Sequence, residues 1–450
     1  MKPFADLLDR LVLTPSRNAK LKLLIDYLAA TPDPDRGYAI AAITRDLDIL
    51  SVKPAMIRAL VSERVDEVLF GYSYDFVGDL AETVSLIWPA AEVENPEADL
   101  RLSAIVETLQ AASRSDGPKL VERWLDDLDS SGRYALLKLI TGGMRIGVSS
   151  RLMKQALADY GAKDVTEIEE LWHGLAPPYL PLFDWLDGKA EKPENLAAAP
   201  FRPVMLAQAI DEAADFGRLD PADYAAEWKW DGIRIQAVSE QGIRRLYSRT
   251  GDDISGVFPD VVEALDFEGA LDGELLVRRD GVVAPFGDLQ QRLNRKTVDA
   301  RMLRAYPAAI RAYDILALEG EDLRTLTFTE RRARLEALVA QLDNPRIDLS
   351  PLQPFETWAE LAELRADPPA GDAQIAEGLM LKHLTSIYEA GRPKGPWFKW
   401  KRDPFLIDAV LMYAQRGHGK RSSFYSDYTF GCWNGDPDAG AELLPVGKAY

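Results

Sequence analysis

The stretch Glu227-Trp228-Lys229-Trp230-Asp231-Gly232-Ile233-Arg234 is the most informative part of this 450-residue sequence. Its K-x-D-G-x-R pattern places a lysine between two tryptophans, with an arginine a few residues on. A wall of low dielectric constant and a nearby cation both lower the pKa of an amine, which makes the amine a better nucleophile. The Asp-Gly turn lets the backbone approach a ligand closely. The stretch therefore predicts a nucleophilic lysine at a ligand site, although a hairpin turn with an exposed lysine would have the same pattern.

Short strands joined by Gly- and Asp-containing turns surround this stretch from about residue 204 onward. One hairpin is predicted from 233–238, through Glu240-Gln241-Gly242, to 243–248. A second runs from 271–277, through Asp280-Gly281, to 282–286. Helices are predicted around 258–265 and 330–342. This mixture predicts an α+β domain with antiparallel sheets.

The first 190 or so residues have the periodicity of helices. Apolar residues recur at i, i+3, i+4 and i+7 in two segments, Leu21, Leu24, Ile25, Leu28 and Leu102, Ile105, Val106, Leu109. The opening run MKPFADLLDRLVL carries two aspartates in its apolar stretch, which indicates a helix of the fold and not a signal peptide. We predict an all-α region, followed by a Pro- and Ala-rich interdomain connection at about 174–203.

A glycine-flanked loop at 141–147 lies between two of these predicted helices and contains Arg145. Ser149 or Ser150 is a suitable N-cap for the helix that follows, and Gly161 is suitable for its end. A plain helix–turn–helix is one interpretation of the segment. A phosphate bound by Arg145 ahead of the helix N-terminus is the other.

The segment after Asp403 has the character of a second β region. Strands are predicted at 406–413 and around 426–433, with the basic run Arg416-Gly417-His418-Gly419-Lys420-Arg421 between them. The residues that remain are too few for a stable barrel of ordinary size.

Composition and charge limit the kinds of site. Cys432 is the only cysteine, which excludes internal disulfides, four-cysteine zinc sites and cysteine-rich clusters. The three histidines lie far apart, so a metal here would be a hard cation held by carboxylates and phosphates. The formal net charge of −19 taken alone argues against a nucleic-acid partner. No apolar run is long enough for a transmembrane helix, and we expect no membrane contact and a cytoplasmic protein.

Five further motifs follow the Lys229 stretch in order along the chain. They are Ser248-Arg249-Thr250-Gly251, Leu271-Asp272-Gly273-Glu274-Leu275, Tyr313-Asp314-Ile315-Leu316, Glu377-Gly378-Leu379-Met380-Leu381-Lys382 and Trp397-Phe398-Lys399-Trp400-Lys401. Each is weak alone, because D-G-E is a common hairpin and W-F-K-W-K an ordinary amphipathic strand. With all of them in this order, the sequence resembles the covalent nucleotidyltransferase superfamily, and specifically bacterial-type ATP-dependent DNA ligases that carry an N-terminal DNA-binding domain.

This resemblance implies a role for each motif. Lys229 matches the adenylated catalytic lysine, and Glu227 matches the residue that reads the adenine. The implied cofactors are ATP and Mg²⁺, with Glu274 and Glu377 near the metal and Lys382 near phosphate. The implied ATP site comprises Glu227, Lys229, Arg234, Arg249, Glu274, Tyr313, Arg392, Lys399 and Lys401, with Tyr313 stacking on adenine and the two lysines at the α-phosphate.

The resemblance also implies three phosphoryl transfers. Lys229 takes AMP from ATP, AMP passes to the 5′-phosphate of a nick in duplex DNA, and the 3′-hydroxyl displaces it to seal the strand. Such transfers are catalysed mainly by alignment and by neutralisation of charge.

Basic residues gather locally in spite of the acidic total. Residues 392–402 contain no acid, and residues 291–304 contain Arg292, Arg295, Lys296, Arg301 and Arg304. Contacts to DNA phosphates are expected from these clusters and from Arg145, Arg249, Lys382, Arg416, Lys420 and Arg421. A solvated face explains any one cluster equally well.

The resemblance covers nearly the whole chain. It implies a helical DNA-binding domain at 1–190, an adenylation domain with ATP-grasp-like antiparallel sheets at 200–402, and the start of an OB-fold barrel at 403–450. The family's final R-x-D-K-like motif does not occur before Tyr450, so we expect a truncated chain or a fragment. The expected partner is nicked duplex DNA, and the expected state is a nucleoid-associated monomer.

Three alternatives use some of the same residues. An RNA-joining or RNA-capping relative shares the lysine chemistry but does not explain the helical region. An NAD⁺-dependent ligase requires a zinc module that one cysteine cannot build. A non-catalytic DNA-binding scaffold would keep the fold without needing Lys229.

Overall fold

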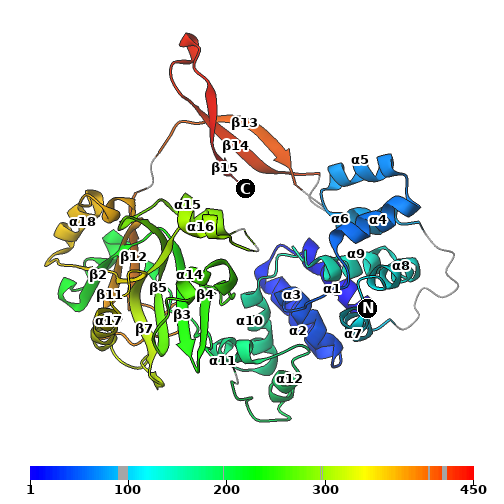
Figure 1. Cartoon of the computed structure of the whole chain (residues 1–450), viewed down its shortest axis with the longest axis horizontal. Coiled ribbons are helices and arrows are strands. Elements are labelled where there is room, and N and C mark those ends of the chain that lie inside the picture. The colour runs from blue at the N-terminus through cyan, green and yellow to red at the C-terminus, as the bar shows by residue number, and fades with distance from the viewer. Residues whose placement is uncertain are drawn as a thin grey trace. The chain divides into compact units, whose positions relative to one another are not determined.

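The computed structural model describes residues 1–89, 100–195, 197–293, 295, 297–403, 406–417 and 423–449. It divides into two compact units (Figure 1). One unit comprises Met1–Val165, Ala176–Pro193 and Phe405–Tyr450, and the other comprises Thr166–Leu175 and Glu194–Pro404. Within the described ranges, no helix is both long and apolar enough to cross a membrane.

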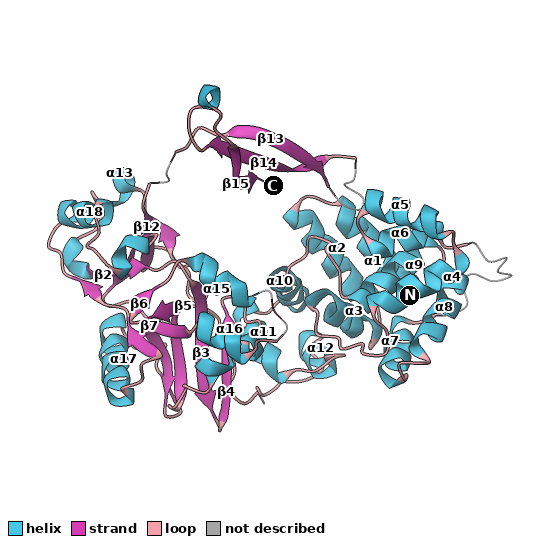
Figure 2. Ribbon diagram, turned by 45° about the horizontal axis from the view of Figure 1, so that its top comes forward, coloured by secondary structure: helices cyan, strands magenta, loops and turns pink. Residues whose placement is uncertain are grey.

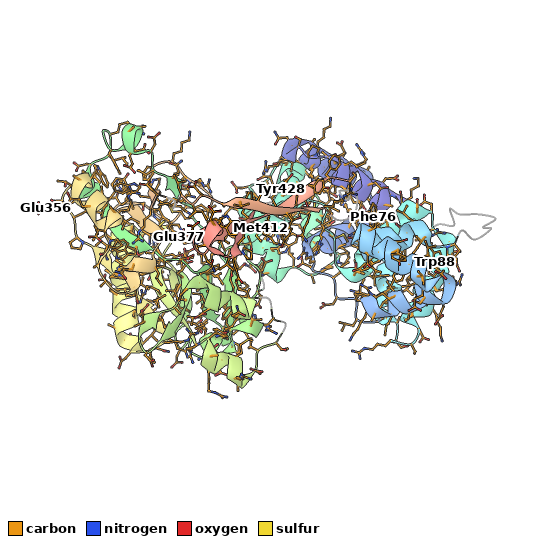
Figure 3. The ribbon with its side chains drawn as sticks, turned by 90° about the horizontal axis from the view of Figure 1, so that it is seen from above. Phe76, Trp88, Glu356, Glu377, Met412 and Tyr428 are labelled. Carbon is orange, nitrogen blue, oxygen red and sulfur yellow. The ribbon has the colours of Figure 1, made fainter. Side chains whose placement is uncertain are left out.

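The N-terminal part of the chain is helical, as its periodicity predicts. Its α-helices are α1 (Lys2–Leu13), α2 (Arg17–Ala30), α3 (Asp35–Thr44), α4 (Pro54–Arg64), α5 (Glu67–Val77), α6 (Leu80–Ile87), α7 (Leu102–Ala111), α8 (Gly117–Asp127), α9 (Ser130–Thr141), α10 (Ser150–Gly161) and α12 (Leu180–Leu186). The apolar face expected at 102–109 is buried, since Ile105, Val106 and Leu109 are all fully inaccessible. Trp88 lies in this interior, whereas Phe76 on α5 is largely exposed (Figure 3).

The loop that contains Arg145 lies between α9 and α10. The Ser149 hydroxyl accepts a hydrogen bond from the Leu152 N–H, which confirms the predicted N-cap. Helix α10 ends at Gly161, but Ala162 and not the glycine takes the left-handed conformation. Buried Lys20 donates to the carbonyl oxygens of Ile146 and Gly147, at 2.7 and 3.0 Å, so an interior lysine holds the loop.

The predicted connection at 174–203 is not wholly irregular. It contains α12, which begins at Leu180 with a proline in its first turn and buries Leu182 and Phe183. A proline at the start of a helix removes no hydrogen bond, so the Pro-rich composition did not exclude this helix.

Two sheets form the second unit (Figure 2). One has the order β1-β12-β11-β2-β10 and consists of β1 (Gln208–Ala209), β2 (Tyr224–Lys229), β10 (Leu352–Gln353), β11 (Gly378–His383) and β12 (Trp397–Lys401). The other has the order β4-β3-β5-β7-β8, with β6 beside β5 and β9 beside β7; its strands are β3 (Ile233–Glu240), β4 (Ile243–Ser248), β5 (Gly269–Arg279), β6 (Val282–Val283), β7 (Ala308–Leu318), β8 (Glu321–Asp322) and β9 (Ile347–Leu349). The pairs β1–β12 and β7–β9 are parallel and the remaining pairs are antiparallel, which confirms the predicted α+β class.

The remaining helices are α11 (Val165–Leu171), α13 (Glu212–Asp215), α14 (Pro259–Val262), α15 (Phe286–Leu293), α16 (Ala300–Ala305), α17 (Phe328–Leu342) and α18 (Trp358–Ala366). Of these, α14, α15 and α17 pack against strands of the second sheet. Helix α17 begins with a capping box between Thr327 and Glu330 and packs on β7. Leu335 of α17 joins Leu271, Leu275 and Ile310 in the buried core between helix and sheet.

The structure confirms the first of the two predicted hairpins and only part of the second. The first is confirmed as β3 and β4, with Gln241 and Gly242 both at positive φ, as a tight hairpin turn requires. In the second, the prediction of a strand to 286 is wrong, because β6 stops at Val283 and α15 begins at Phe286. Pro285 has no N–H to continue a strand ladder and sits naturally just before a helix.

The C-terminal β region is a sheet of β13 (Val410–Arg416), β14 (Tyr425–Trp433) and β15 (Leu443–Ala449), in that order. Met412 and Tyr428 in Figure 3 mark its first two strands. The strand predicted at 406–413 starts at Val410 instead, and Leu406 is 93% exposed. The strand predicted around 426–433 is confirmed. Lys420 and Arg421 lie outside the described residues.

Candidate active site

The six motifs converge on one cavity between the two sheets of the second unit. Its volume is about 520 Å³, within the range of sites for small ligands. Every residue expected at the ATP or metal site lines it: Glu227, Lys229, Arg234, Arg249, Glu274, Tyr313, Glu377, Arg392, Lys399 and Lys401. Strands β2, β11 and β12 supply one wall, and β3, β5 and β7 supply the other.

Lys229 ends β2, and its amine donates a hydrogen bond to Oε2 of Glu377. Trp228 and Trp230 belong to the buried apolar cluster of this sheet, and Trp230 donates its ring N–H to Ser350 at 3.0 Å. The tryptophans therefore anchor the strand. The charged neighbour of the amine is a carboxylate, and not the arginine that the sequence suggested.

Gly378 lets three strands meet at this point. In the sheet register it pairs with Lys229 on one side and with Lys401 on the other. Its φ is +143°, and a Cβ there would lie 2.2 Å from the Trp400 carbonyl oxygen. Only glycine fits this geometry, which brings both lysines to Glu377.

Arg234 has a structural role beside the cavity. Its guanidinium contacts both carboxylate oxygens of Asp272 at 3.0 and 2.6 Å, the Met205 carbonyl at 2.7 Å and the Tyr388 hydroxyl at 3.0 Å. Burial lowers the pKa of Arg234, but the charge and hydrogen bonds of Asp272 together with Tyr313 and Tyr388 outweigh burial and raise it well above its ordinary value. Most of its donors are occupied by protein, so Arg234 shapes the wall and has little capacity left for ATP.

The two carboxylates expected at the metal have opposite electrostatics. Desolvation raises the pKa of Glu274 to about 8, although Lys229 and Arg234 oppose the shift. Burial also raises the pKa of Glu377, but hydrogen bonds and charge from Lys229 and Lys401 reverse this and lower it overall. Near neutral pH, Glu274 is therefore largely protonated and Glu377 is ionised.

Glu274 gives the protein a specific pH dependence. An unfolded glutamate ionises near pH 4.5, whereas the folded one ionises near 8, so unfolding releases a proton between these values. The stability that Glu274 contributes is fully present below about pH 4.5 and is lost as the pH rises through 8. Compared with Glu274→Gln, the wild type should lose up to about 1.4 kcal/mol of unfolding free energy per pH unit in this window, and then level off. Urea titrations of both proteins at pH 6 to 9 measure this, and parallel profiles would contradict it.

Cations gather at the outer part of the cavity. Burial, followed by Arg392, Lys401, Lys229 and Arg249, lowers the pKa of Lys399. Lys401 pairs with Glu377 at 3.1 Å, but no acid within ion-pair distance of Lys399 is found in the described part of the chain. An unpaired cation among other cations fits a polyanionic ligand.

Lys382 lies elsewhere than expected. It is 1% exposed, its amine is 2.9 Å from Oε1 of Glu227, and it donates to the Tyr313 carbonyl at 3.0 Å. A lysine buried in this way cannot reach a phosphate on a duplex, which corrects the expected DNA contact. It lies at the inner, buried end of the cavity.

Some of the other predicted phosphate contacts are exposed, and others are already paired with groups of the protein. Arg145, Arg249, Arg295, Arg301, Arg304, Arg392 and Arg416 are exposed. Arg292 is fully buried and paired with Asp260 at 2.6 Å, so its inclusion in a surface cluster is wrong. Arg402 donates to the carbonyls of Ala373 and Gln374. Lys296, Lys420 and Arg421 fall in the segments that the structure leaves undescribed.

Sequence reasoning missed residues that contact the cavity-lining side chains and hold them in place. Asp272 stands inside a quoted motif, yet its pairing with Arg234 was not foreseen. Tyr388 donates its hydroxyl to Asp272 at 2.5 Å, and Arg332 approaches Glu227 to 4.0 Å. Neither Tyr388 nor Arg332 belongs to a motif, so only the three-dimensional contacts reveal them.

Comparison with known proteins agrees with this geometry. Residues 204–401 match the family described as "ATP dependent DNA ligase domain", and residues 1–158 match "DNA ligase N terminus". A "Probable DNA ligase" of Koribacter versatilis is 28% identical over all of this chain and 82% of that protein. A "Probable DNA ligase" of Anaeromyxobacter sp. is 30% identical over 81% of this chain and 74% of that protein.

A solved structure titled "Pmar-Lig_PreS3" has the same fold, with a TM-score of 0.54 at 16% sequence identity, over 99% of this chain and 87% of that one. Fold, ordered motifs, cavity and relatives lead to one conclusion. The chain is an enzyme that belongs to the ATP-dependent DNA ligase family.

Proposed function

We propose that this chain seals 3′-hydroxyl/5′-phosphate nicks in duplex DNA through a lysine–AMP and then a DNA-adenylate. The observation that carries the proposal is the placement of the Lys229 amine, beside Glu377 and in a cavity whose outer cations include Lys399 with no acidic partner. A nucleophilic amine next to unpaired cations suits attack on a phosphate ester.

The first step follows from these positions. The Lys229 nitrogen forms a bond to the α-phosphorus of ATP, and the bond from that phosphorus to the pyrophosphate oxygen breaks. Glu377 accepts the hydrogen bond of the amine and is placed to hold its proton. Lys399, Lys401, Arg249 and Arg392 neutralise the negative charge of the phosphates. Tyr313 and Glu227 then bind the base at the inner end.

The acidic residues fit a magnesium ion that is bound together with the nucleotide. The ionised carboxylate of Glu377 lines the cavity together with Glu274, which a bound cation would hold in its ionised form, and no group of three possible metal ligands occurs among the described residues. Mg²⁺ often binds through one or two carboxylates and completes its shell with phosphates and water. It would supply charge neutralisation at the phosphates.

We further propose the partner and the division of labour along the chain. The helical part at 1–190 would hold the duplex, with exposed Arg145 before α10 contacting a phosphate. The part at 200–402 would carry adenylation, and the part at 403–450, with Arg416, would belong to an OB fold. The protein would act as a monomer on DNA at the nucleoid.

Removing one outer cation tests the phosphate assignment. Lys399→Ala should weaken ATP binding about 10- to 100-fold, because charge-assisted hydrogen bonds contribute about 1.5 to 3 kcal/mol. Adenosine, which has no phosphate, should bind almost as before. Isothermal titration with both ligands measures the effect.

The matched control is Lys394→Ala, which removes an exposed lysine of the same segment that does not line the cavity. This variant should bind both ligands like the wild type. Equal losses for ATP and adenosine in Lys399→Ala would show a general disruption and contradict the assignment.

The function itself is tested by sealing assays on matched substrates. The chain should join a nicked DNA duplex with ATP and should join a nicked RNA duplex poorly. Preference for the RNA duplex would favour the RNA-joining alternative. Binding to nicked DNA without any joining would favour the non-catalytic scaffold.

A further inference from the structure

The inner end of the cavity holds buried charges that the ligase motifs do not fully account for. Glu227 and Lys382 are each 1% exposed, and Arg332 is 6% exposed. Glu227 lies on β2 and Lys382 on β11, but Arg332 lies on α17 and outside every motif. Buried charges are costly, and in a cleft they point to a functional role.

Two donors in this cluster lack hydrogen-bond partners. Oε1 of Glu227 pairs with the Lys382 amine at 2.9 Å and lies 4.0 Å from Nη1 of Arg332. Nη1 of Arg332 makes no hydrogen bond with the residues the structure describes. The ring N–H of Trp397, which lines the same cavity, has none either. Unsatisfied buried polar atoms at the end of a cavity indicate that a ligand supplies polar groups there.

Arg332 is fixed from the side away from the cavity. Its Nε donates to Glu336 at 2.7 Å, and its Nη2 donates to the Ser350 carbonyl at 2.8 Å. The remaining nitrogen is thereby left facing Glu227. An ionised carboxylate accepts hydrogen bonds and donates none.

We propose that Arg332 is a positioning residue for base selection, which together with Lys382 holds Glu227 as an acceptor for the 6-amino group of adenine. A 6-oxo purine presents an oxygen at that place, and two acceptors would face each other without a hydrogen. The inference rests on the proposed function, because it takes the cavity as the ATP site. It assigns Lys382 to the base and not to a phosphate.

The test compares ATP with inosine triphosphate, in which a 6-oxo group replaces the 6-amino group and N1 carries a hydrogen. Dissociation constants are measured by titration calorimetry on the full chain. The wild type should bind ATP about 10- to 100-fold more tightly than inosine triphosphate. In Arg332→Met this ratio should fall by about tenfold, mainly through weaker ATP binding. Arg334 lies on the same helix, but its side chain is 52% exposed and pairs with Glu321 instead of Glu227. Arg334→Met should therefore keep the wild-type ratio.

A second variant protects the test against misfolding. Glu336→Gln weakens the outer anchor of Arg332 without touching the cavity, since Glu336 is 49% exposed. It should lower the ratio about threefold. A wild type without preference for ATP, or an unchanged ratio in folded Arg332→Met and Glu336→Gln, would overturn the inference.

Protein–AMP formation, followed in parallel by intact mass, separates the two claims. Selective ATP binding without protein–AMP would overturn the proposed function and leave base selection supported. Protein–AMP formation together with an ATP preference that is unchanged in the Arg332 variant would support the proposed function and overturn the base-selection inference.

Discussion

Lys229→Ala is expected to abolish ATP-dependent nick sealing, with a loss of at least about 10⁴-fold, because it removes the nucleophile of the first step. The same variant should still seal a nick that already carries AMP on its 5′-phosphate, since that step uses the 3′-hydroxyl and not the amine. Glu377 retains Lys401 as a partner at 3.1 Å, so the variant should fold normally. Gel assays on plain and pre-adenylated nicks measure both activities.

The pre-adenylated substrate is also the internal control. Sealing of plain nicks by Lys229→Ala at a rate near that of the wild type would contradict the assignment of the nucleophile. Loss of both activities would mean that alanine disturbs the cavity as a whole.

The second large effect is on the free energy of unfolding, and it comes from a buried ion pair next to the site. Arg331 of α17 and Asp314 of β7 form an ion pair whose side chains are fully buried, with contacts of 2.8 and 3.0 Å. Arg331 also donates to the carbonyls of Leu326 and Ser386. Arg331→Met should lower the unfolding free energy by about 3 to 5 kcal/mol, because it leaves a buried carboxylate without its cationic partner.

Urea denaturation followed by tryptophan fluorescence measures this change. Arg334→Met is the matched control, since its pair with Glu321 is 3.8 Å apart and half exposed, and it should cost less than about 1 kcal/mol. A loss for Arg331→Met as small as that of the control would show that the buried pair does not stabilise the packing of α17 on β7.

Local pattern predicts much of this fold. Gln241 and Gly242 mark a tight turn, and the alternation on either side of it gives β3 and β4. The apolar spacing at 102–109 gives α7 and its buried face. The order of the motifs is enough to predict which residues line the cavity, because each motif lies on or beside a strand that faces it.

The failures concern contacts between residues distant in sequence. Arg292 stands in a basic run, and nothing local shows that Asp260 takes it into the interior. The sequence motif predicts that Lys382 binds phosphate, but in the sheet its amine lies against Glu227. Arg332 and Tyr388 act through partners more than 100 residues away, a relation that periodicity and spacing do not encode.

The central claim is that Lys229 forms a covalent bond with AMP, and the intact mass of the protein tests it most directly. After incubation with ATP and Mg²⁺, the mass should rise by one AMP group, and it should return to its original value when nicked duplex DNA is added. A mass that stays unchanged with ATP, in protein that binds the nucleotide, would contradict the account.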